Sequence, residues 1–265
     1  MVSPTRVVIS GAQGRMGQAL LELLGAEESI QPVGLLENEG SFASGACLPV
    51  GHWGDVGLLS QVRAADDFDV LIDFSTPLAS LAHLNACAEL GKAMVIGTTG
   101  FDDAGQACIR EAARQIPIMQ ASNYSLGVAM LMRLAQSVSA SLGQNAQIEI
   151  VEMHHHRKVD APSGTALSLL DRVQKGLGQA VSVTHGREGQ VGPRPPQEIG
   201  MHALRGGDVV GEHSIIFAME GERLELVHKA SSRSNFAQGA LACAKWLADG
   251  QIAGLYGIED LLGTN

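Results

Sequence analysis

Residues 6–17 read R-V-V-I-S-G-A-Q-G-R-M-G, and this stretch decides the fold of the first part of the chain. The β-branched apolar run at 6–10 predicts a strand, and it leads directly into a glycine-rich turn. Apolar residues at helical spacing follow between Ala19 and Leu24. Strand, glycine turn and helix in this order are the setting of a dinucleotide-binding fingerprint. The sequence therefore predicts an α/β fold with a Rossmann-like parallel sheet.

The glycines of this turn have the spacing G-x-x-G-x-x-G, whereas the commoner fingerprint, G-x-G-x-x-G, has a glycine where this chain has Gln13. The physical purpose of each glycine is kept. Gly11 permits a sharp turn, Gly14 lets the backbone approach a pyrophosphate, and Gly17 permits close packing of helix on strand. The predicted cofactor contacts in the turn are Gly11, Ala12, Gln13, Gly14, Arg15 and Met16.

A second predicted strand, residues 32–36, is followed by Glu37. Glu37 lies 20 residues after Gly17, where an acidic residue that accepts hydrogen bonds from the adenosine ribose is expected. An ordinary solvated carboxylate after a strand is the alternative interpretation. The spacing and the glycine turn together favour ribose binding. Residues 38–66 are interpreted as a loop with a short helix and no chemistry.

Three further apolar runs predict parallel strands, and each is followed by a turn of small, hydroxyl-bearing or glycine residues. The runs are residues 69–74, 93–96 and 117–121, with predicted helices at 78–90 and 102–115 between them. Ligands bind at the carboxyl ends of the strands in such sheets, so these turns are expected to line one cofactor site. Each turn by itself could be an ordinary turn that binds no ligand, because such residues are common in turns. The candidates from these turns are Ser75, Gly97, Thr98, Thr99, Ala121, Ser122, Asn123 and Tyr124.

From residue 147 the pattern changes to strands with little helix between them, which predicts a second, α+β domain with a mixed or antiparallel sheet. A helix at 127–142 leads into it, and residues 186–197, with three prolines and three glycines, are interpreted as a mobile loop. A closing helix at 235–248 is expected to pack on the first domain. The predicted strands are residues 147–153, 181–185, 209–219 and 222–228.

Titratable and cationic side chains concentrate in residues 152–165, which read E-M-H-H-H-R-K-V-D-A-P-S-G-T. Three histidines, an arginine and a lysine fall within residues 154–158, and helical spacing begins after Thr165. A helix N-terminus favours anions because it presents free N–H groups and the positive end of the helix dipole. The stretch therefore predicts a site for a small anionic substrate with proton donors beside it. A solvated loop is the alternative, and a zinc site is disfavoured because adjacent histidines lack the i, i+4 spacing and no cysteine lies nearby.

The composition fits a folded α/β chain with glycine-rich turns: 265 residues, 45% of them hydrophobic, and 32 glycines. The formal net charge of −10 argues against general affinity for nucleic acid or for an anionic membrane, so an anion site has to be a local basic pocket. Four scattered cysteines form no metal or disulfide pattern. They favour reduced thiols and a cytoplasmic location, and neither export nor a membrane span is expected.

Seven motifs combine along the chain. They are V-I-S-G-A-Q-G-R-M-G at 8–17, D-F-S-T-P at 73–77, V-I-G-T-T-G-F at 95–101, S-N-Y-S-L-G at 122–127, H-H-H-R-K-V-D-A-P-S-G-T-A at 154–166, G-E-H at 211–213 and H-K-A-S-S-R at 228–233. From about residue 6 to 262 the chain resembles the dihydrodipicolinate reductase family of lysine and diaminopimelate synthesis, and the histidine-containing motif is specific to that family.

The resemblance implies two domains with different tasks. A Rossmann-like domain, residues 1–125 with 232–265, would bind NADH or NADPH, and the last segment of the chain would complete it. A central α+β domain, residues 126–231, would hold a cyclic dicarboxylate that carries an imine, and its sheet would build a homotetramer. Closure of the domains and hydride transfer would then yield tetrahydrodipicolinate.

The resemblance also assigns roles within residues 154–165. It implies that His154 is the catalytic acid or base, that Lys158 donates a proton, and that His155 contacts the substrate. As charge develops at the imine a proton has to arrive, and the sequence leaves open which of His154 and Lys158 delivers it. The implied clamp on a substrate carboxylate consists of Ser163, Gly164 and Thr165.

Cofactor preference depends on the residues around Glu37. Some relatives carry an arginine after this acid that contacts the 2′-phosphate of NADPH, whereas this chain has Asn38. Glu37 would repel that phosphate, and Arg15 is the cation left nearby to offset it. The sequence therefore predicts that NADH is used at least as well as NADPH. Arg233 is expected either to face the cleft between the domains or to form a structural salt bridge.

Two other functions compete with this interpretation. Another two-domain nicotinamide reductase would share the fold, but the run at 154–165 argues against it. A non-catalytic NAD-sensing regulator should carry a helix-turn-helix or a basic face, and the sequence shows neither.

Overall fold

The computed structural model describes residues 3–263, and the chain divides into two compact units. The first unit takes the residues up to Leu126 and again from Ser234, and the second is Gly127–Arg233. Within residues 3–263, no helix combines the length and the apolar character needed to cross a bilayer.

The first unit is built on a sheet with the strand order β13-β7-β6-β5-β1-β2-β4-β3. All neighbouring strands are parallel except β3, which is antiparallel to β4. The strand order reverses direction between β1 and β5, which is the switch point where such sheets bind ligands. The strands are β1 (Thr5–Ser10), β2 (Ile30–Leu36), β3 (Cys47–Pro49), β4 (Asp55–Leu59), β5 (Val70–Asp73), β6 (Ala93–Ile96), β7 (Pro117–Gln120) and β13 (Gly254–Tyr256).

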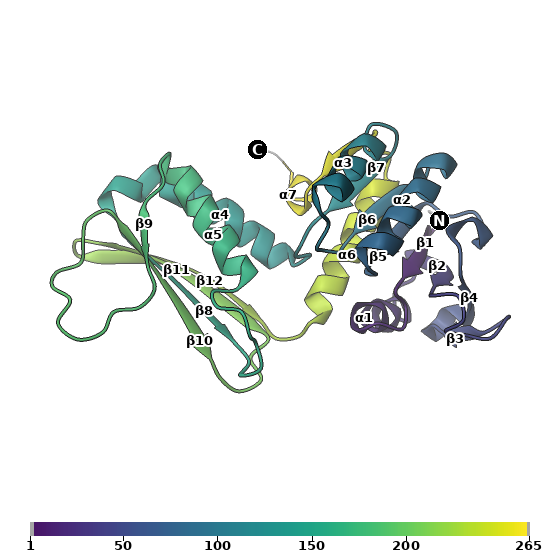
Figure 1. Cartoon of the computed structure of the whole chain (residues 1–265), viewed down its shortest axis with the longest axis horizontal. Helices are drawn as coiled ribbons and strands as arrows, with labels where there is room; N and C mark the ends of the chain where they lie inside the picture. Colours follow the sequence, from purple (N-terminus) through teal and green to yellow (C-terminus); the bar gives the residue numbers. More distant parts are fainter. Residues whose placement is uncertain (1–2, 264–265) are drawn as a thin grey trace. The chain divides into compact units, whose positions relative to one another are not determined.

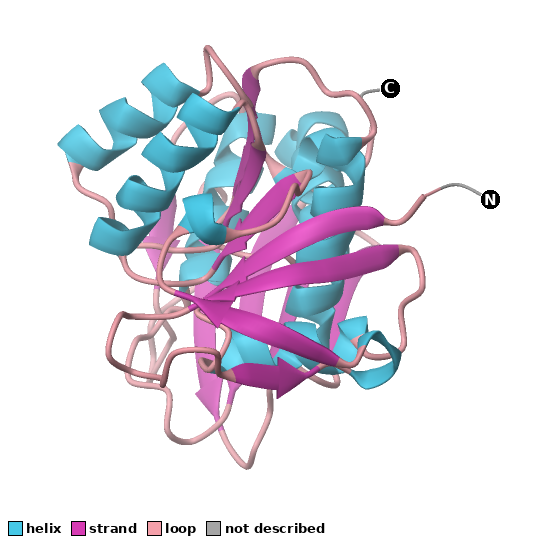
Figure 2. Cartoon of the chain, turned by 90° about the vertical axis from the view of Figure 1, so that its right-hand side faces the viewer, coloured by secondary structure: helices cyan, strands magenta, loops and turns pink. Residues whose placement is uncertain are grey.

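Helices pack on this sheet from both sides (Figure 2). Helix α2 contacts α3 and strand β6, while α6 contacts α1 and strands β1, β5, β6 and β7. The closing helix therefore packs on the first unit, as the sequence predicted. Strand β13, which was not predicted, pairs beside β7. The helices and turns are α1 (Arg15–Leu24), α2 (Pro77–Leu90), α3 (Asp103–Ala112), α6 (Ser234–Ala248), α7 (Ile258–Leu261), and the 3-10 turns η1 (Gly51–Trp53) and η2 (Val62–Ala64).

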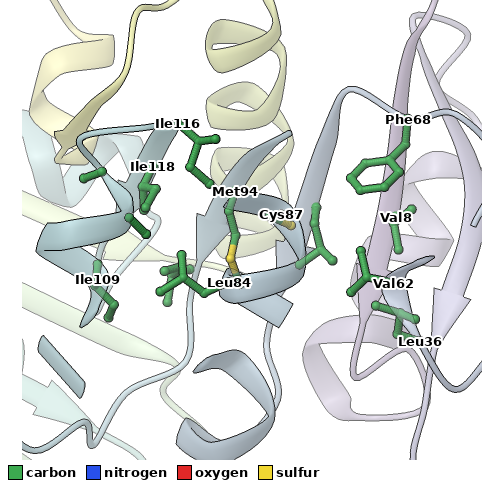
Figure 3. Close-up of a cluster of buried hydrophobic side chains, with 14 residues drawn as sticks. Val8, Leu36, Val62, Phe68, Leu84, Cys87, Met94, Ile109, Ile116 and Ile118 are labelled. Carbon is green, nitrogen blue, oxygen red and sulfur yellow. The ribbon is translucent and has the colours of Figure 1, made fainter. Parts of the chain in front are cut away.

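Apolar side chains of α2 and the central strands form a core of the first unit (Figure 3). Leu84 and Cys87 from α2 lie beside Met94 from β6, and all three are fully buried or nearly so. Every residue of β5 and β6 is buried. A parallel strand covered on both faces reads as a continuous apolar run, which is why the sequence located these strands well.

The prediction for residues 38–66 was incomplete. This segment contains two strands besides short helical turns, and β4 extends the sheet beside β2. The strands are only three and five residues long, with Pro49 in β3 and Gly57 in β4. Glycine and proline weaken strand signals in such short runs, so the pairing with β2 decided the structure here.

The second unit has a mixed sheet with the order β12-β11-β8-β10-β9, as predicted. Strand β11 is antiparallel to β8 and β12, and β10 runs parallel to β8 and β9. Strand β10 was not predicted, because it follows a proline-rich loop and contains Gly200. The elements are α4 (Leu126–Leu142), the 3-10 turn η3 (Gly143–Asn145), β8 (Gln147–His154), α5 (Gly164–Leu177), β9 (Ser182–Thr184), β10 (Glu198–Arg205), β11 (Gly211–Met219) and β12 (Glu222–Ala230).

Helices α4 and α5 lie along one face of this sheet (Figure 1). Successive side chains of β8 point to opposite faces of the sheet. Ile148 and Ile150 therefore join the core beneath the helices, and Glu152 is buried on the same face. The opposite face carries Glu149. The loop interpreted as mobile is tied to this face, because Arg187 and Arg194 each hydrogen-bond Oε1 of Glu149 at 2.9 Å.

Candidate active site

The glycine turn between β1 and α1 has the close packing that the fingerprint requires. Gly11 has φ +75°, and a Cβ on it would lie 2.5 Å from the carbonyl oxygen of Phe74. A Cβ on Gly17 would lie 2.2 Å from the carbonyl oxygen of Gly11. Neither glycine has room for a side chain, so the turn packs closely on the residue after β5 and on the start of α1.

Glu37 is brought to the same turn. Its Oε1 accepts a hydrogen bond of 2.6 Å from the backbone N–H of Gln13. Arg15 is exposed in the first turn of α1, and the carbonyl oxygen of Asn38 accepts from Ser41 at the start of the following loop. The structure thus places the predicted ribose acid against the predicted phosphate turn, although 24 residues separate Gln13 and Glu37.

A buried carboxylate that the sequence did not assign, Asp73, joins the other turns of this sheet edge. Its Oδ1 accepts from the Oγ of Ser75 at 2.9 Å and from the Oγ1 of Thr98 at 2.6 Å. Its Oδ2 accepts from the Nδ1 of His83 at 2.6 Å, and the Ser10 hydroxyl lies 3.3 Å from the same nitrogen. Burial alone would raise the pKa of Asp73, but hydrogen bonds from His83 and Thr98 hold it below the usual value.

The hydroxyls of Ser75 and Thr98 therefore point at Asp73. A Cβ on Gly97 would lie 2.0 Å from the ring of Phe74, so there is no space for a side chain at this position. Tyr124 is buried, and its hydroxyl donates to the carbonyl oxygens of Ile96 and Met119, at 2.8 and 3.2 Å. Burial also raises the pKa of Tyr124 well above the usual value.

The remaining candidates of this edge lie close to the surface. Thr99 and Ser122 are exposed, and Ala121 is half-buried. The Asn123 side chain accepts from the backbone N–H of Ser125 at 2.8 Å, which closes the turn after β7.

In the second unit, His154 stands at the end of β8 and pairs with a carboxylate. Its Nδ1 lies 2.6 Å from Oε2 of Glu152, which is completely buried. Arg205 from β10 binds both oxygens of Glu152 at 2.8 Å, and the backbone N–H of Ser163 donates to Oε1 at 3.1 Å. Burial alone would raise the pKa of Glu152, but hydrogen bonds from Arg205 and His154 lower it.

The start of α5 lies beside this pair. Ser163 is its N-cap, and the Ser163 hydroxyl accepts from the backbone N–H of Ala166 at 3.1 Å. Gly164 is exposed and Thr165 is half-buried in the first turn. The helix therefore presents backbone N–H groups of its first turn next to the histidine, as the sequence predicted.

The three adjacent histidines have different surroundings. His156 is exposed and its Nδ1 lies 2.8 Å from the carbonyl oxygen of Gly207. His155 is half-buried, and burial and then the positive charges of Arg233 and Arg157 lower its pKa. Of these three side chains, only His154 is paired with a carboxylate among the described interactions of residues 3–263.

Lys158 is held near the same segment. Its Nζ lies 2.9 Å from Oδ1 of Asp160, and its backbone N–H donates to the carbonyl oxygen of His155 at 3.1 Å. Arg205 also reaches the carbonyl oxygen of Asp160, at 2.6 Å. The lysine is thus ordered beside the histidines by local contacts.

His213, within the G-E-H motif, is a further site residue for which no role was predicted from the sequence. Its ring meets that of His154 edge to face at a centroid distance of 5.2 Å, and its Nε2 lies 3.2 Å from the Ser163 hydroxyl. Burial, with help from the charge of His154, lowers the pKa of His213 to about 4, so this ring is neutral near pH 7.

The residues that the sequence missed carried weak signals. Asp73 ends an otherwise apolar strand, and Glu152 shares the apolar face of β8 with Ile148 and Ile150. A buried acid requires partners. Nothing local pointed to His83 or Arg205, because these partners come from other elements. Within residues 3–263 no group of three or more histidine, cysteine or acidic side chains is arranged to hold a metal ion.

Comparison with known proteins identifies the family of the chain. Residues 5–124 match the family described as dihydrodipicolinate reductase, N-terminus, and residues 127–262 match dihydrodipicolinate reductase, C-terminus. The 4-hydroxy-tetrahydrodipicolinate reductase of Thiobacillus denitrificans is 47% identical over 263 residues, covering 97% of this chain and 98% of that protein.

Solved structures give the same result. The dipicolinate-bound dihydrodipicolinate reductase from Paenisporosarcina sp. TG-14 has a TM-score of 0.79 and 25% identity, and covers 97% of this chain and 99% of that one. A myo-inositol dehydrogenase from Corynebacterium glutamicum shares the fold, with a TM-score of 0.57, 14% identity, and coverage of 93% and 89%. The two family matches together span almost all of the sequence, and the chain therefore belongs to the dihydrodipicolinate reductase family.

Proposed function

We propose that the chain reduces 4-hydroxy-tetrahydrodipicolinate, a cyclic dicarboxylate that carries an imine, to tetrahydrodipicolinate. The ring hydroxyl leaves as water, and a reduced nicotinamide cofactor donates the hydride. The observation that carries this proposal is the buried Glu152–His154 pair beside the start of α5. It combines a proton-exchanging side chain with an anion-binding helix end, inside the stretch most specific to the family.

The first unit supplies the cofactor site. The N–H groups at the start of α1 bind the pyrophosphate, and Glu37, already fixed to the Gln13 backbone, accepts from the adenosine ribose. The turns after β5, β6 and β7 hold the rest of the dinucleotide through backbone groups. When bound, the nicotinamide supplies the hydride.

The second unit holds the substrate by its charge. Gly164 and Thr165 present the first-turn N–H groups of α5 to one carboxylate, and the helix dipole favours it there. The Nδ1 of His155 is a buried atom without a hydrogen-bond partner among the described residues, and it suits a polar substrate group. These contacts fix the orientation of the ring relative to the proton donors.

Two side chains can supply the proton that the imine nitrogen needs. The Nδ1 of His154 is bound to Glu152, so its Nε2 is the nitrogen that exchanges a proton with the substrate. Lys158 adds a fixed positive charge that stabilises negative charge as it develops. We assign proton delivery to His154, and the role of Lys158 is to favour the transition state electrostatically.

The pair Glu37 and Asn38 sets the cofactor preference. A carboxylate fixed beside the glycine turn disfavours the 2′-phosphate of NADPH, and Asn38 has no charge to offset it. We propose that NADH is used at least as well as NADPH. A kcat/KM strongly in favour of NADPH would contradict this.

The sheet face opposite α4 and α5 is the proposed assembly surface. It carries Leu204 and Val227, and each of these side chains has 49% of its surface exposed. The same sheet also carries the ion pair of Glu212 and Lys229. A homotetramer would cover these apolar side chains. Sedimentation of the wild type and of a Val227→Glu variant tests this, and an unchanged monomer in both samples would contradict it.

The activity is tested by following the loss of reduced-cofactor absorbance. Substrate is generated in situ from pyruvate and aspartate semialdehyde by the synthase of the preceding step, with NADH and NADPH compared. Oxidation that depends on the synthase product supports the proposal. Protein that binds NADH but oxidises none of it would instead favour a sensor or a reductase of another substrate.

A further inference from the structure

We propose that Glu152 and Arg205 are positioning residues that set the tautomer and the proton affinity of His154 and connect this ring to the anion-binding start of α5. The inference deepens the proposed function and rests on it for the role of His154. Glu152 and Arg205 themselves are not in contact with the reacting atoms.

Both carboxylate oxygens of Glu152 are fully engaged in hydrogen bonds. Its Oε2 accepts from His154 and Arg205, at 2.6 and 2.8 Å, and its Oε1 accepts from Arg205 and from the Ser163 backbone, at 2.8 and 3.1 Å. The side chain is completely buried. A carboxylate with four donors and no exposure cannot serve as the acid or base, so its effect has to pass through its partners.

Glu152 also determines which ring nitrogen of His154 carries a hydrogen. An ionised carboxylate only accepts hydrogen bonds, so Nδ1 has to carry a hydrogen and Nε2 is left to gain and lose the catalytic proton. Strand β11 leaves room beside that nitrogen, because a Cβ on Gly211 would lie 3.1 Å from Nε2. The glycine of the G-E-H motif thus keeps Nε2 accessible.

Glu152 and Arg205 place opposite charges near the ring of His154. Glu152 by itself favours the imidazolium form, and Arg205 opposes it from β10. The other titratable groups near His154 are His213 on β11 and, in the segment after β8, His155 and Lys158 with its partner Asp160. His213 is neutral near pH 7, so Glu152 and Arg205 are the charges that bond directly into this site.

The Glu152 carboxylate also organises the start of α5, the helix that is proposed to bind the substrate. The backbone N–H of Ser163 binds Glu152, and the Ser163 hydroxyl both caps Ala166 and meets His213. The proton donor and the carboxylate clamp are therefore fixed to one buried group. A shift of Glu152 would move both at once.

The test uses the full-length protein with ¹⁵N-labelled histidine. The pH titration and the tautomer of His154 are measured by NMR in the wild type, Glu152→Gln and Arg205→Gln. Losing the negative charge should move the His154 titration to lower pH, whereas losing the positive charge should move it to higher pH, each by about one unit. Glu152→Gln should also populate the second tautomer, because a glutamine side chain can donate as well as accept.

Steady-state kinetics supply the second measurement. In Glu152→Gln, kcat should fall by about 100-fold, because a ring in the wrong tautomer or position is inefficient, and the pH profile should move with the NMR titration. Arg205→Lys should restore most of the wild-type titration, since it keeps the charge. Equal shifts in the same direction for both neutral variants, or no shift, would overturn the inference.

A matched control exists on the other face of the same strand. Glu149 is also a carboxylate bound by a histidine and two arginines, namely His202, Arg187 and Arg194. Glu149→Gln should leave the titration of His154 unchanged. Thermal melts and NADH titrations establish that each variant is folded, and Arg205→Lys keeps the test informative if Glu152→Gln does not fold.

Failure of the inference can be distinguished from failure of the proposed function. If the chain lacks reductase activity, the NMR titrations still report whether Glu152 and Arg205 control His154. If activity is present but both variants keep the wild-type titration and tautomer, the function stands and the positioning role is wrong.

Discussion

Each unit of the molecule contains a fully buried carboxylate that binds the Nδ1 of a histidine at 2.6 Å. In the first unit the pair is Asp73 and His83, and in the second it is Glu152 and His154. The remaining donors differ in kind. Asp73 is completed by the hydroxyls of Ser75 and Thr98 and by the backbone N–H of Ser75, whereas Glu152 is completed by an arginine and by the start of a helix.

The difference indicates two uses of one motif. Neutral hydroxyl donors fix backbone turns without supplying a compensating charge. Asp73 joins the turns after β5 and β6, and its partner His83 meets Ser10 at the end of β1. Arg205 gives Glu152 a permanent counter-charge, so His154 can gain and lose a proton without leaving an unpaired buried anion. The second arrangement suits the catalytic role proposed for His154, and the first suits the cofactor-binding role proposed for the turns after β5 and β6.

The largest expected effect separates the two histidines. His154→Gln should lower kcat by about 10²- to 10⁴-fold, with little change in the dissociation constant for NADH, because it removes the proton donor. His83→Gln should act mainly on NADH affinity and on melting temperature. Comparable losses of kcat in both variants would show that the two pairs do not have different tasks.

Asp73→Asn tests the structural pair directly. We expect a loss of about 1–3 kcal/mol in the free energy of unfolding, because buried hydrogen bonds to a charged group are weakened. NADH binding should weaken with it, and KM for the cofactor should change more than kcat. Urea denaturation and fluorescence titration measure these effects.

The control for Asp73→Asn is Asp67→Asn. Asp67 has 76% of its side chain exposed and is paired with Lys92 at 2.6 Å. The change in unfolding free energy should be much smaller than for Asp73→Asn, because surface ion pairs contribute little. A similar cost for both variants would weaken the assignment of Asp73 as the group that joins the turns.

A smaller effect should follow from Asn38→Arg, which alters only the cofactor half of the comparison. The new guanidinium should raise kcat/KM for NADPH by about tenfold relative to NADH, equivalent to about 1.4 kcal/mol, because arginine binds phosphate well. Asn38→Gln is the neutral control. An unchanged preference in Asn38→Arg would mean that Asn38 does not lie beside the ribose.

The smallest expected effect is the acid dependence of Glu149, the arginine-bound carboxylate that has no assigned role in catalysis. Hydrogen bonds from Arg187, His202 and Arg194 overcome the raising effect of burial and lower the pKa of Glu149 to about 2, from an ordinary value of 4.5. A depressed carboxyl pKa contributes stability above the ordinary value and loses it as the pH falls toward the folded value.

Unfolding free energies of the wild type and Glu149→Gln should therefore differ by on the order of 1 kcal/mol near pH 7. The difference should shrink between about pH 4.5 and pH 2. Denaturation curves at several pH values measure it. A difference that grows on acidification would have the wrong sign for this network.

Much of this architecture could be predicted from local sequence. The glycine turn after β1 and the helix start at Ser163 both rest on short-range rules, namely φ > 0 at Gly11 and capping of a free helix end. The continuous apolar runs of β5 and β6 identified buried parallel strands. The sequence therefore determined where each candidate site lies along the chain.

Only the tertiary structure decided which side chains act together. His154, His155 and His156 are equivalent by pattern, and they differ because β8 ends at His154 and the following turn sends His156 toward Gly207. Arg205 reaches Glu152 across 53 residues, since β10, a strand the sequence did not reveal, pairs beside β8. Periodicity reports what is local, whereas the partner of a buried charge is chosen by the order and register of the strands.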